Sequence, residues 1–156
     1  MDIRIREGTR RDHDLIWRET MQTVWNDIPE GERRTLDRAR LEAHFRPHAK
    51  QVIDSPENAM FVAEGAGGQV LGYTIVGAAT TMLTPTPFGF VYDMWVAPDA
   101  RRRGVAHRLL DRACDWCRAR GYGKLKLEVA ATNGAARALY ASHGFAEERV
   151  FLGKVL

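Results

Sequence analysis

The stretch from Tyr92 to Leu110, YDMWVAPDARRRGVAHRLL, restricts the fold of this chain more than any other part of the sequence. An apolar run ends at Val96, and Pro98 interrupts it because proline has no N–H to donate to a sheet. Three arginines and Gly104 come next, and apolar residues then recur at helical spacing. We therefore predict a strand, a basic turn and a helix.

The start of this predicted helix is suited to bind an anion. Its first backbone N–H groups have no partner within the helix, and the helix dipole places positive charge there. Gly104 has no Cβ, so an anion can approach the backbone closely. These features favour a phosphate or pyrophosphate site. The alternative interpretation is a solvated run of arginines that caps a strand–helix unit.

Two separated motifs favour the phosphate or pyrophosphate site over the solvated run of arginines. The segment 101–106, RRRGVA, resembles the acyl-CoA pyrophosphate loop of the GCN5-related N-acetyltransferases, whose pattern is Gln/Arg-x-x-Gly-x-Gly/Ala. The segment 127–145 resembles the second half of the same family's signature, in the form found in bacterial ribosomal-protein alanine N-acetyltransferases. The residues that carry this second likeness are Leu127, Glu128, Val129, Asn133, Ala136, Leu139, Tyr140, Gly144 and Phe145. The resemblance covers residues 59–156 closely and implies an acetyl-CoA-dependent enzyme.

Length and composition predict one globular domain over residues 1–156. The chain is 45% hydrophobic and 28% charged, which is typical of a packed core. No apolar run is long enough to span a bilayer, and the first residues show no secretory signal, so we expect no membrane partner and a cytoplasmic location. A net charge of +3 fits an anionic cofactor. Nucleic-acid binding is less favoured, because the basic residues are spread out and lack a pattern of base-stacking aromatics.

The periodicity of apolar residues predicts the order of the elements. Strands are expected at 2–6, 60–63, 70–80, 88–96, 124–130 and 150–156, and helices from 9 or 12 to about 25, from about 32 to 52, at 104–121 and at 134–142. Pro47 is expected to kink or split the second helix. The fold class is α/β, with a mixed, mostly antiparallel sheet, one parallel strand pair and helices on both faces. A ligand would then lie between Val96 and Ala130, beyond the ends of the parallel strands.

The resemblance assigns most of the predicted cofactor site. It implies that backbone N–H groups of the basic turn hold the pyrophosphate and that the arginines add charge. It also implies that the main chain of Trp95 and Val96 contacts the pantetheine arm and that the Val96 N–H stabilises the oxyanion. Asn133 matches the asparagine that contacts pantetheine, and it also suits the N-cap of a helix. The predicted cofactor residues are Trp95, Val96, Arg101, Arg102, Arg103, Gly104, Val105, Ala106, Asn133 and Tyr140.

The predicted catalytic residues are a tyrosine and two carboxylates. Tyr140 matches the tyrosine that protonates the leaving thiolate, although a half-buried aromatic on an amphipathic helix is the simpler interpretation of the residue alone. Glu128 is the first candidate for the general base, because its place resembles that of the acidic residue in the ribosomal-protein enzymes. Asp93 is the second candidate. Relatives often carry a Glu-Asp pair there, but this chain has Tyr92 in the first position.

The acceptor site is expected between the first two helices and the 82–87 connection. Aromatic and acidic residues there suit a cationic amine, although most of them could belong to the core or to a solvated face; they are Trp17, Trp25, Asp27, Glu30 and Glu32. We predict no metal, because the five histidines lack ligand spacing. Cys114 and Cys117 are expected to pack as reduced thiols.

The leading hypothesis is therefore an N-acetyltransferase that transfers an acetyl group from acetyl-CoA to an amine of a small molecule, peptide or protein. The alternatives are a non-catalytic acyl-CoA-binding regulatory module and, less favoured, a nucleic-acid-binding domain. A homodimer is compatible with the sequence.

Overall fold

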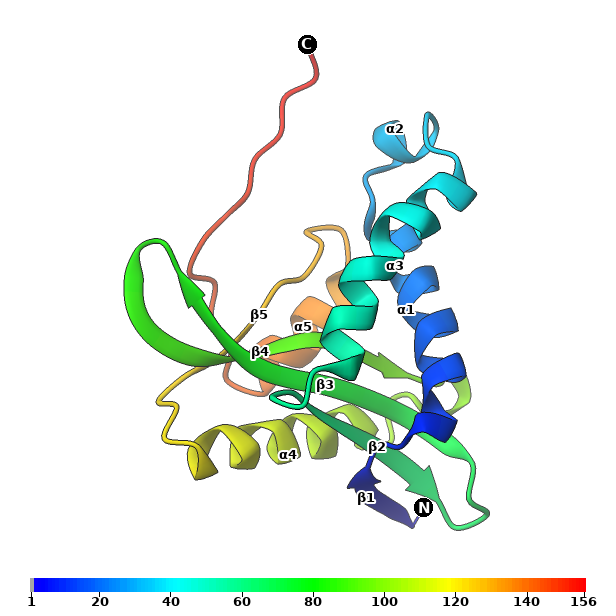
Figure 1. Cartoon of the computed structure of the whole chain (residues 1–156), viewed down its shortest axis with the longest axis vertical. Coiled ribbons are helices and arrows are strands. Elements are labelled where there is room, and N and C mark those ends of the chain that lie inside the picture. The colour runs from blue at the N-terminus through cyan, green and yellow to red at the C-terminus, as the bar shows by residue number, and fades with distance from the viewer. Residues whose placement is uncertain (1) are drawn as a thin grey trace.

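The computed structural model of the protein describes residues 2–156, and its centre is a five-stranded sheet in the order β1-β2-β3-β4-β5 (Figure 1). The strands are β1 (Ile3–Glu7), β2 (Ala59–Gly65), β3 (Val70–Thr81), β4 (Thr84–Val96) and β5 (Leu125–Leu127). Neighbouring strands are antiparallel except β4 and β5, which are parallel. The predicted fold class is confirmed, including the single parallel pair.

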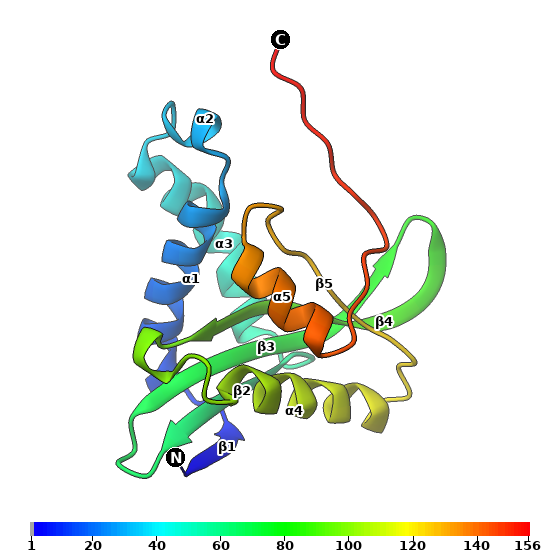
Figure 2. The ribbon, with the colours of Figure 1, turned by 180° about the vertical axis from the view of Figure 1, so that it is seen from behind.

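Helices cover both faces of the sheet, as Figures 1 and 2 show. The helical elements are η1 (Arg10–Asp12), α1 (His13–Asp27), α2 (Glu30–Arg33), α3 (Arg38–Asp54), η2 (Pro98–Ala100), α4 (Val105–Ala119) and α5 (Gly134–Ser142). On one face, Ile16 of α1 packs against Val62, Tyr73 and Ile75. On the other face, α4 packs against residues of β1, β2 and β3. Successive side chains of a strand point to opposite faces of the sheet, so the core is divided into two parts, each covered by its own helices.

The helix predicted from about residue 32 to 52 is divided, but not at Pro47. Pro47 lies inside the continuous helix α3, and the break between α2 and α3 comes earlier, before Arg38. Asp37 causes this break, because its side chain accepts a 2.7 Å hydrogen bond from the Ala39 N–H and so caps a new helix. The prediction that Pro47 splits the helix is wrong.

Residues 82–87 also differ from the connection that was predicted there. Thr81 pairs with Thr84, so only residues 82 and 83 form the turn, and Pro85 and Pro87 belong to β4. Strand β5 pairs with β4 only from Gly89 onward. Prolines are tolerated in this part of β4 because it is an edge without a neighbour on the β5 side.

Strand β5 is shorter than the predicted strand at 124–130, and this shortness opens the sheet. It pairs with Gly89, Phe90 and Val91 of β4 and ends at Leu127. Beyond that point β4 continues to Val96 with β3 as its one strand neighbour. The two parallel strands therefore leave a gap on the side of β4 that faces away from β3.

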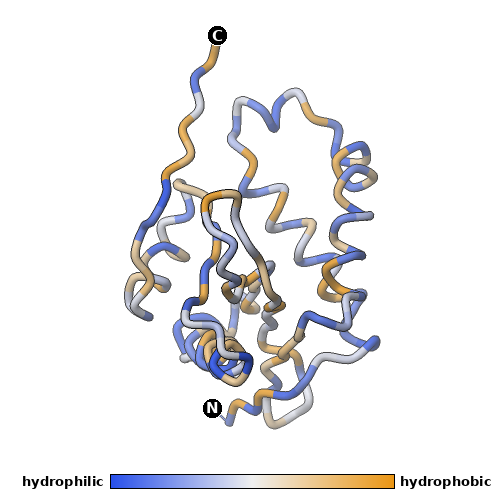
Figure 3. The backbone as a smooth tube through the Cα atoms, turned by 60° about the vertical axis from the view of Figure 1, so that its left-hand side comes forward, coloured by the Kyte–Doolittle hydropathy of each residue, from blue (hydrophilic) through white to orange (hydrophobic). Residues whose placement is uncertain are grey.

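The predicted closing strand at 150–156 is wrong. Residues 145–156 contain no regular element, and the tube in Figure 3 shows this segment running away from the body with hydrophobic and hydrophilic residues interspersed. Five of its apolar side chains are exposed: Val150, Phe151, Leu152, Val155 and Leu156. Strand pairing needs a partner backbone, and here this segment does not reach one. Within residues 2–156, no helix is both long and apolar enough to cross a membrane.

Candidate active site

A cleft of about 1,060 Å³ lies where β4 and β5 separate. Its walls come from α1, the end of β4, the turn before α4, the segment after β5, and α5. The cleft therefore occupies the place predicted for the ligand, beyond the carboxyl ends of the parallel strands.

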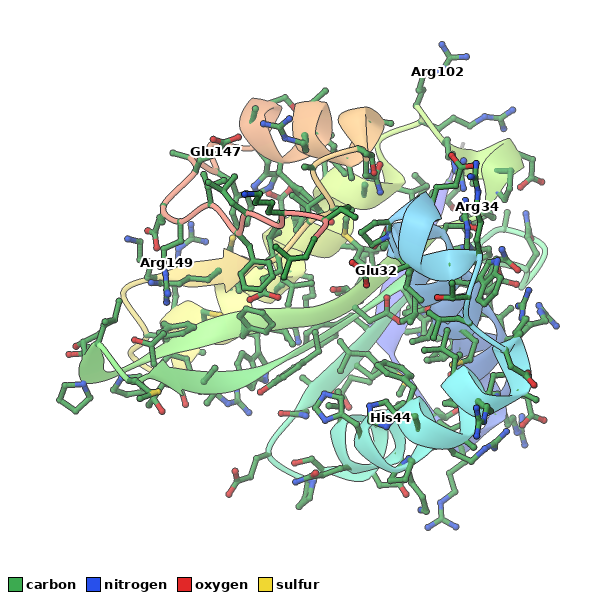
Figure 4. The ribbon with its side chains drawn as sticks, turned by 90° about the horizontal axis from the view of Figure 1, so that it is seen from above. Glu32, Arg34, His44, Arg102, Glu147 and Arg149 are labelled. Carbon is green, nitrogen blue, oxygen red and sulfur yellow. The ribbon has the colours of Figure 1, made fainter. Side chains whose placement is uncertain are left out.

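The basic turn forms one end of this cleft and has the backbone of an anion-binding loop. Arg102 and Gly104 both have positive φ values, of 56° and 82°, so the chain reverses just before the first turn of α4. Arg101 donates from Nε to the Val96 carbonyl at 3.2 Å, which ties the turn to β4. The Arg102 side chain extends away from the body in Figure 4. The N-terminus of α4 is thus presented to the cleft beside the exposed positive charge of the arginines.

Most of the predicted loop residues line the cleft. They are Arg101, Arg102, Gly104, Val105 and Ala106. Val105 is buried and anchors the helix start in the core, so it contributes backbone to the site. Arg103 is exposed and is not among the lining residues. Trp95 and Val96 also line the cleft, on the part of β4 that β5 leaves uncovered.

Asp93 lies in the cleft at the centre of a polar cluster on β4. Its Oδ2 accepts a 2.8 Å hydrogen bond from the Tyr73 hydroxyl and a second bond from the Thr20 hydroxyl of α1. The Thr74 hydroxyl donates to the Asp93 carbonyl at 3.1 Å. Burial raises the pKa of Asp93 above its ordinary value, against the effect of the two hydroxyl donors. Asp93 is therefore a carboxylate with more proton affinity than a solvated one.

Tyr140 of α5 lines the same cleft. Burial raises the pKa of its hydroxyl to about 12, and the negative charges of Asp93 and Asp27 add to the effect. Its ring packs edge-on against Phe145, with centroids 5.7 Å apart. The hydroxyl therefore stays protonated at neutral pH and can donate a proton.

The remaining two predicted residues follow β5. Asn133 lines the cleft and caps α5, because its Oδ1 accepts a 3.1 Å hydrogen bond from the Ala136 N–H. Glu128 also lines the cleft, but it is exposed and comes directly after the last residue of β5. The structure thus places both candidate bases in one cleft and gives them different surroundings.

Of the five residues predicted for the acceptor site, the cleft lining includes one. Asp27 at the end of α1 lines it, and reduced solvation raises the pKa of this carboxyl. The other four predicted acceptor residues do not line the cleft. Trp17 and Trp25 lie under the guanidinium groups of Arg46 and Arg38, while Glu30 and Glu32 are exposed on α2. The 82–87 segment does not line it either.

Sequence reasoning missed Thr20, Tyr73 and Phe45 as site residues. Phe45 of α3 lines the cleft. Tyr73 is fully buried and stacks on Trp95 at 5.9 Å between centroids. Thr20 stands at an inward position of α1, where a hydroxyl needs a partner. A polar residue at an inward position of an otherwise apolar helix face is a signal that could have found Thr20, whereas the buried Tyr73 gives no comparable signal.

The cysteines and histidines do not form a further centre. Cys117 is buried and Cys114 half-buried, and burial raises the pKa of both thiols, that of Cys117 to about 11. His143 lies 2.9 Å from Asp111 and stacks on His107. Across residues 2–156, no three His, Cys, Asp or Glu side chains gather as a metal site would require.

Comparison with known proteins decides the family. The model of the acetyltransferase (GNAT) family matches residues 16–145. The chain belongs to this family. This membership confirms the resemblance that the two motifs indicated, and the match includes the basic turn, the cleft carboxylates and Tyr140.

Relatives of this GNAT chain act on amines. It is 28% identical over 109 residues to the aminoglycoside N(6')-acetyltransferase type 1 of Serratia marcescens, covering 67% of this chain and 75% of that protein. It is 43% identical over 60 residues to the ribosomal protein bS18 alanine N-acetyltransferase of Salmonella typhimurium, covering 38% and 40%. The fold also matches a solved structure of AAC(6')-Iy with the bisubstrate analog CoA-S-monomethyl-acetylneamine, at TM-score 0.67 and 19% identity, covering 100% and 99% of the two chains.

Family membership and these relatives establish the activity class. The protein is an acetyl-CoA-dependent N-acetyltransferase that transfers an acetyl group to an amine. The regulatory-module alternative is not favoured. Acetyl-CoA is the acyl donor, and the cleft fits it, because an anion-binding helix start lies at one end and uncovered β4 backbone lies beside it.

Proposed function

We propose that Asp93, Tyr140 and the basic turn form the catalytic and cofactor machinery for acetyl transfer to a cationic primary amine of a small molecule or peptide. The observation that carries this proposal is the shared cleft. It holds a carboxyl with a raised pKa, a protonated tyrosine and an anion-binding turn. These are the three groups that acyl transfer to an ammonium requires.

The acyl donor is held by the groups at the open end of the sheet. Backbone N–H groups at Gly104, Val105 and Ala106 would bind the pyrophosphate, with Arg101, Arg102 and Arg103 supplying charge. The uncovered backbone of Trp95 and Val96 and the amide of Asn133 would bind the pantetheine arm. Bound acetyl-CoA supplies the thioester carbonyl that the amine attacks.

The residues of the chain then move protons and hold charge. Asp93 accepts a proton from the ammonium of the acceptor, directly or through a water, and the free amine forms a bond to the carbonyl carbon. The Val96 N–H stabilises the negative oxygen. The bond between carbon and sulfur then breaks, and the Tyr140 hydroxyl protonates the departing thiolate. The second proton that the attacking nitrogen must lose to become an amide passes to the Tyr140 oxygen, directly or through water, and restores the hydroxyl.

Three carboxylates line the cleft, and this proposal assigns each of them a different part. Asp93 has the raised pKa and the fixed hydrogen bonds that suit a general base, and Glu128 is an exposed alternative at the opposite strand. Asp27 lies at the acceptor side and attracts a positively charged amine. Its negative charge favours acceptors that carry more than one amino group.

The experiment is a thiol-release assay with acetyl-CoA and a panel of amines that includes di- and polyamines, aminoglycosides, a hydroxylated monoamine with a single positive charge and peptides with free N-termini. We expect release above the hydrolysis background with at least one cationic acceptor. Tight acetyl-CoA binding without release for any amine would support the regulatory module instead. Duplex and single-stranded nucleic acid should show no salt-dependent binding beyond weak charge attraction.

We also propose that the protein acts in the cytoplasm and forms a homodimer. The five exposed apolar side chains of residues 150–156 support the second part, because a surface of this kind marks an interaction site.

A further inference from the structure

Three polar side chains meet on a face of the sheet that is otherwise apolar. In the register of β3 and β4, Tyr73 lies opposite Trp95. Asp93 lies opposite Ile75, two positions along, so Tyr73 and Asp93 are diagonal neighbours on one face. Helix α1 covers this face and adds Thr20 (Figure 1). The three polar side chains therefore come together from β3, β4 and α1.

The two hydroxyl groups are not needed to fill space. Tyr73 is 0% exposed and Thr20 is 7% exposed. A buried hydroxyl costs free energy unless it is hydrogen-bonded, and phenylalanine and valine would fill similar volumes without this cost. Both hydroxyls donate to the same atom, Oδ2 of Asp93, and their own oxygens lie 3.1 Å apart. What the two residues share is therefore the carboxyl.

This pair of donors favours one protonation state of Asp93. An ionised carboxylate accepts both hydrogens, and hydrogen bonds to a charged acceptor are about twice as strong as those between neutral groups. Burial raises the pKa of Asp93, while the bonds from Thr20 and Tyr73 lower it. Burial also raises the pKa of Tyr73, and the charge of Asp93 adds to this effect, so Tyr73 remains a donor. Without the hydroxyls, burial would keep Asp93 protonated to higher pH.

We propose that Tyr73 and Thr20 are positioning residues of the general base, and that their hydroxyls hold the Asp93 carboxyl ionised and in one orientation in the cleft. The inference rests on the proposed function, because it takes Asp93 as the base. It deepens that function by making acetyl transfer near neutral pH depend on two buried hydroxyls from different elements.

Other titratable groups around Asp93 stay unchanged in the test of this proposal. The charge of Asp27, at the end of α1, raises the pKa of Asp93, and Glu19 of the same helix raises that of Tyr73. Six further titratable side chains line the cleft: Tyr92, Arg101, Arg102, His107, Glu128 and Tyr140. Variants confined to the two hydroxyls therefore report on the hydroxyls.

The first measurement is the pH profile of kcat/KM with one good amine acceptor. In Tyr73→Phe and in Thr20→Val, the acidic limb should move up by about one to two pH units, because each variant loses a hydrogen bond to a charged group. The rate should approach that of the wild type at high pH. Thr20→Ser keeps a hydroxyl and should restore the wild-type limb. Tyr122→Phe is the matched control, because Tyr122 packs against Trp116 and does not line the cleft.

The second measurement does not depend on turnover. The carboxyl 13C signals of labelled aspartates are titrated by NMR, and the signal that is missing in Asp93→Asn belongs to Asp93. The pKa of Asp93 should rise in Tyr73→Phe and in Thr20→Val and stay in place in Tyr122→Phe. Circular dichroism checks that every variant is folded.

The outcomes separate this inference from the proposed function. An unchanged pKa of Asp93 in both hydroxyl variants, or a loss of rate that is equal at every pH, would overturn the positioning role and leave Asp93 as the base. A raised pKa without a matching shift of the rate limb would overturn Asp93 as the base, and with it the catalytic part of the inference.

Discussion

At the scale of single residues, the site depends on how burial changes proton affinity. Asp93 and Glu128 are both carboxylates in the cleft, but only Asp93 is held by the hydroxyls of Thr20 and Tyr73. Burial raises the pKa of Asp93. The sequence placed Glu128 first through its likeness to relatives. Burial depends on which helix covers a strand, so the sequence alone did not separate the two residues.

The first prediction concerns the general base. Asp93→Asn should remove the acidic limb of the pH profile of kcat/KM, because a raised pKa means that wild-type Asp93 gains its base form as pH rises through that value. Glu128→Gln should keep the limb. The measurement is a pH–rate profile of both variants with one good acceptor, and the opposite pattern would move the role to Glu128.

The same pKa shift has a consequence for stability. A carboxyl whose pKa is raised in the folded state favours folding when protonated, and this contribution is lost as pH rises through the folded pKa. The melting temperature of wild type relative to Asp93→Asn should therefore fall from acid to neutral pH. A constant difference would show that Asp93 titrates alike in folded and unfolded chains.

The second prediction concerns the general acid. Tyr140→Phe keeps the ring against Phe145 and removes the hydroxyl, so kcat should fall ~100-fold while acetyl-CoA affinity stays near wild type. Because the pKa of Tyr140 is about 12, the wild type should show no loss of rate from this group below about pH 10. Wild-type turnover in the variant across this range would remove Tyr140 from the mechanism.

At the scale of elements, the turn before α4 is the part of the site that the sequence predicted best. A proline, three arginines and a glycine fix a strand end and a helix start locally, and the structure has both within a residue of the expected positions. Which helix residues line the cleft was predicted less well, since Asp27 does and Trp17 and Trp25 do not. The lining depends on the angle at which α1 and α3 cross the sheet, which local patterns do not encode.

The third prediction tests this turn. Gly104 has φ of 82° and faces the cleft, so Gly104→Glu adds strain, bulk and negative charge where the pyrophosphate would bind. Acetyl-CoA binding by calorimetry should fall below detection with a normal circular dichroism spectrum. Gly123→Glu is the matched control, because Gly123 has open space around it and does not line the cleft. Equal affinities for the two variants would contradict the assignment of the turn.

At the scale of the whole molecule, the order of the elements followed from periodicity, and the differences at the second helix and at the C-terminal segment have physical causes. Pro47 was expected to kink or split the second helix. The break instead comes before Arg38, because the side chain of Asp37 caps the start of α3. Residues 150–156 have the pattern of a strand, but a strand also needs a partner edge within reach. Long-range pairing of this kind is a property of the assembled molecule, and a single chain's pattern does not specify it.

The last prediction concerns an ion-pair cluster that joins distant parts of the fold. Asp12 accepts hydrogen bonds from Arg6 at 2.8 and 2.9 Å and from the Thr9 N–H at 2.7 Å, and Arg6 also pairs with Glu64 at 2.7 Å. These residues connect β1, the start of α1 and β2. Asp12 is 5% exposed, and its bonds to Arg6 lower the pKa of its carboxyl to about 2.

A lowered pKa stabilises the fold above the ordinary aspartate value, and this stabilisation is lost as pH falls from about 4 through about 2. Asp12→Asn should therefore reduce the free energy of unfolding at neutral pH by about 2 kcal/mol, measured by urea denaturation, and the loss should shrink in acid. Asp54→Asn is the control, because Asp54 pairs with Lys50 on the exposed surface and a pair of this kind contributes little. If both variants lost the same stability at every pH, the Arg6–Asp12 pair would not be the link that holds β1 to the first helix.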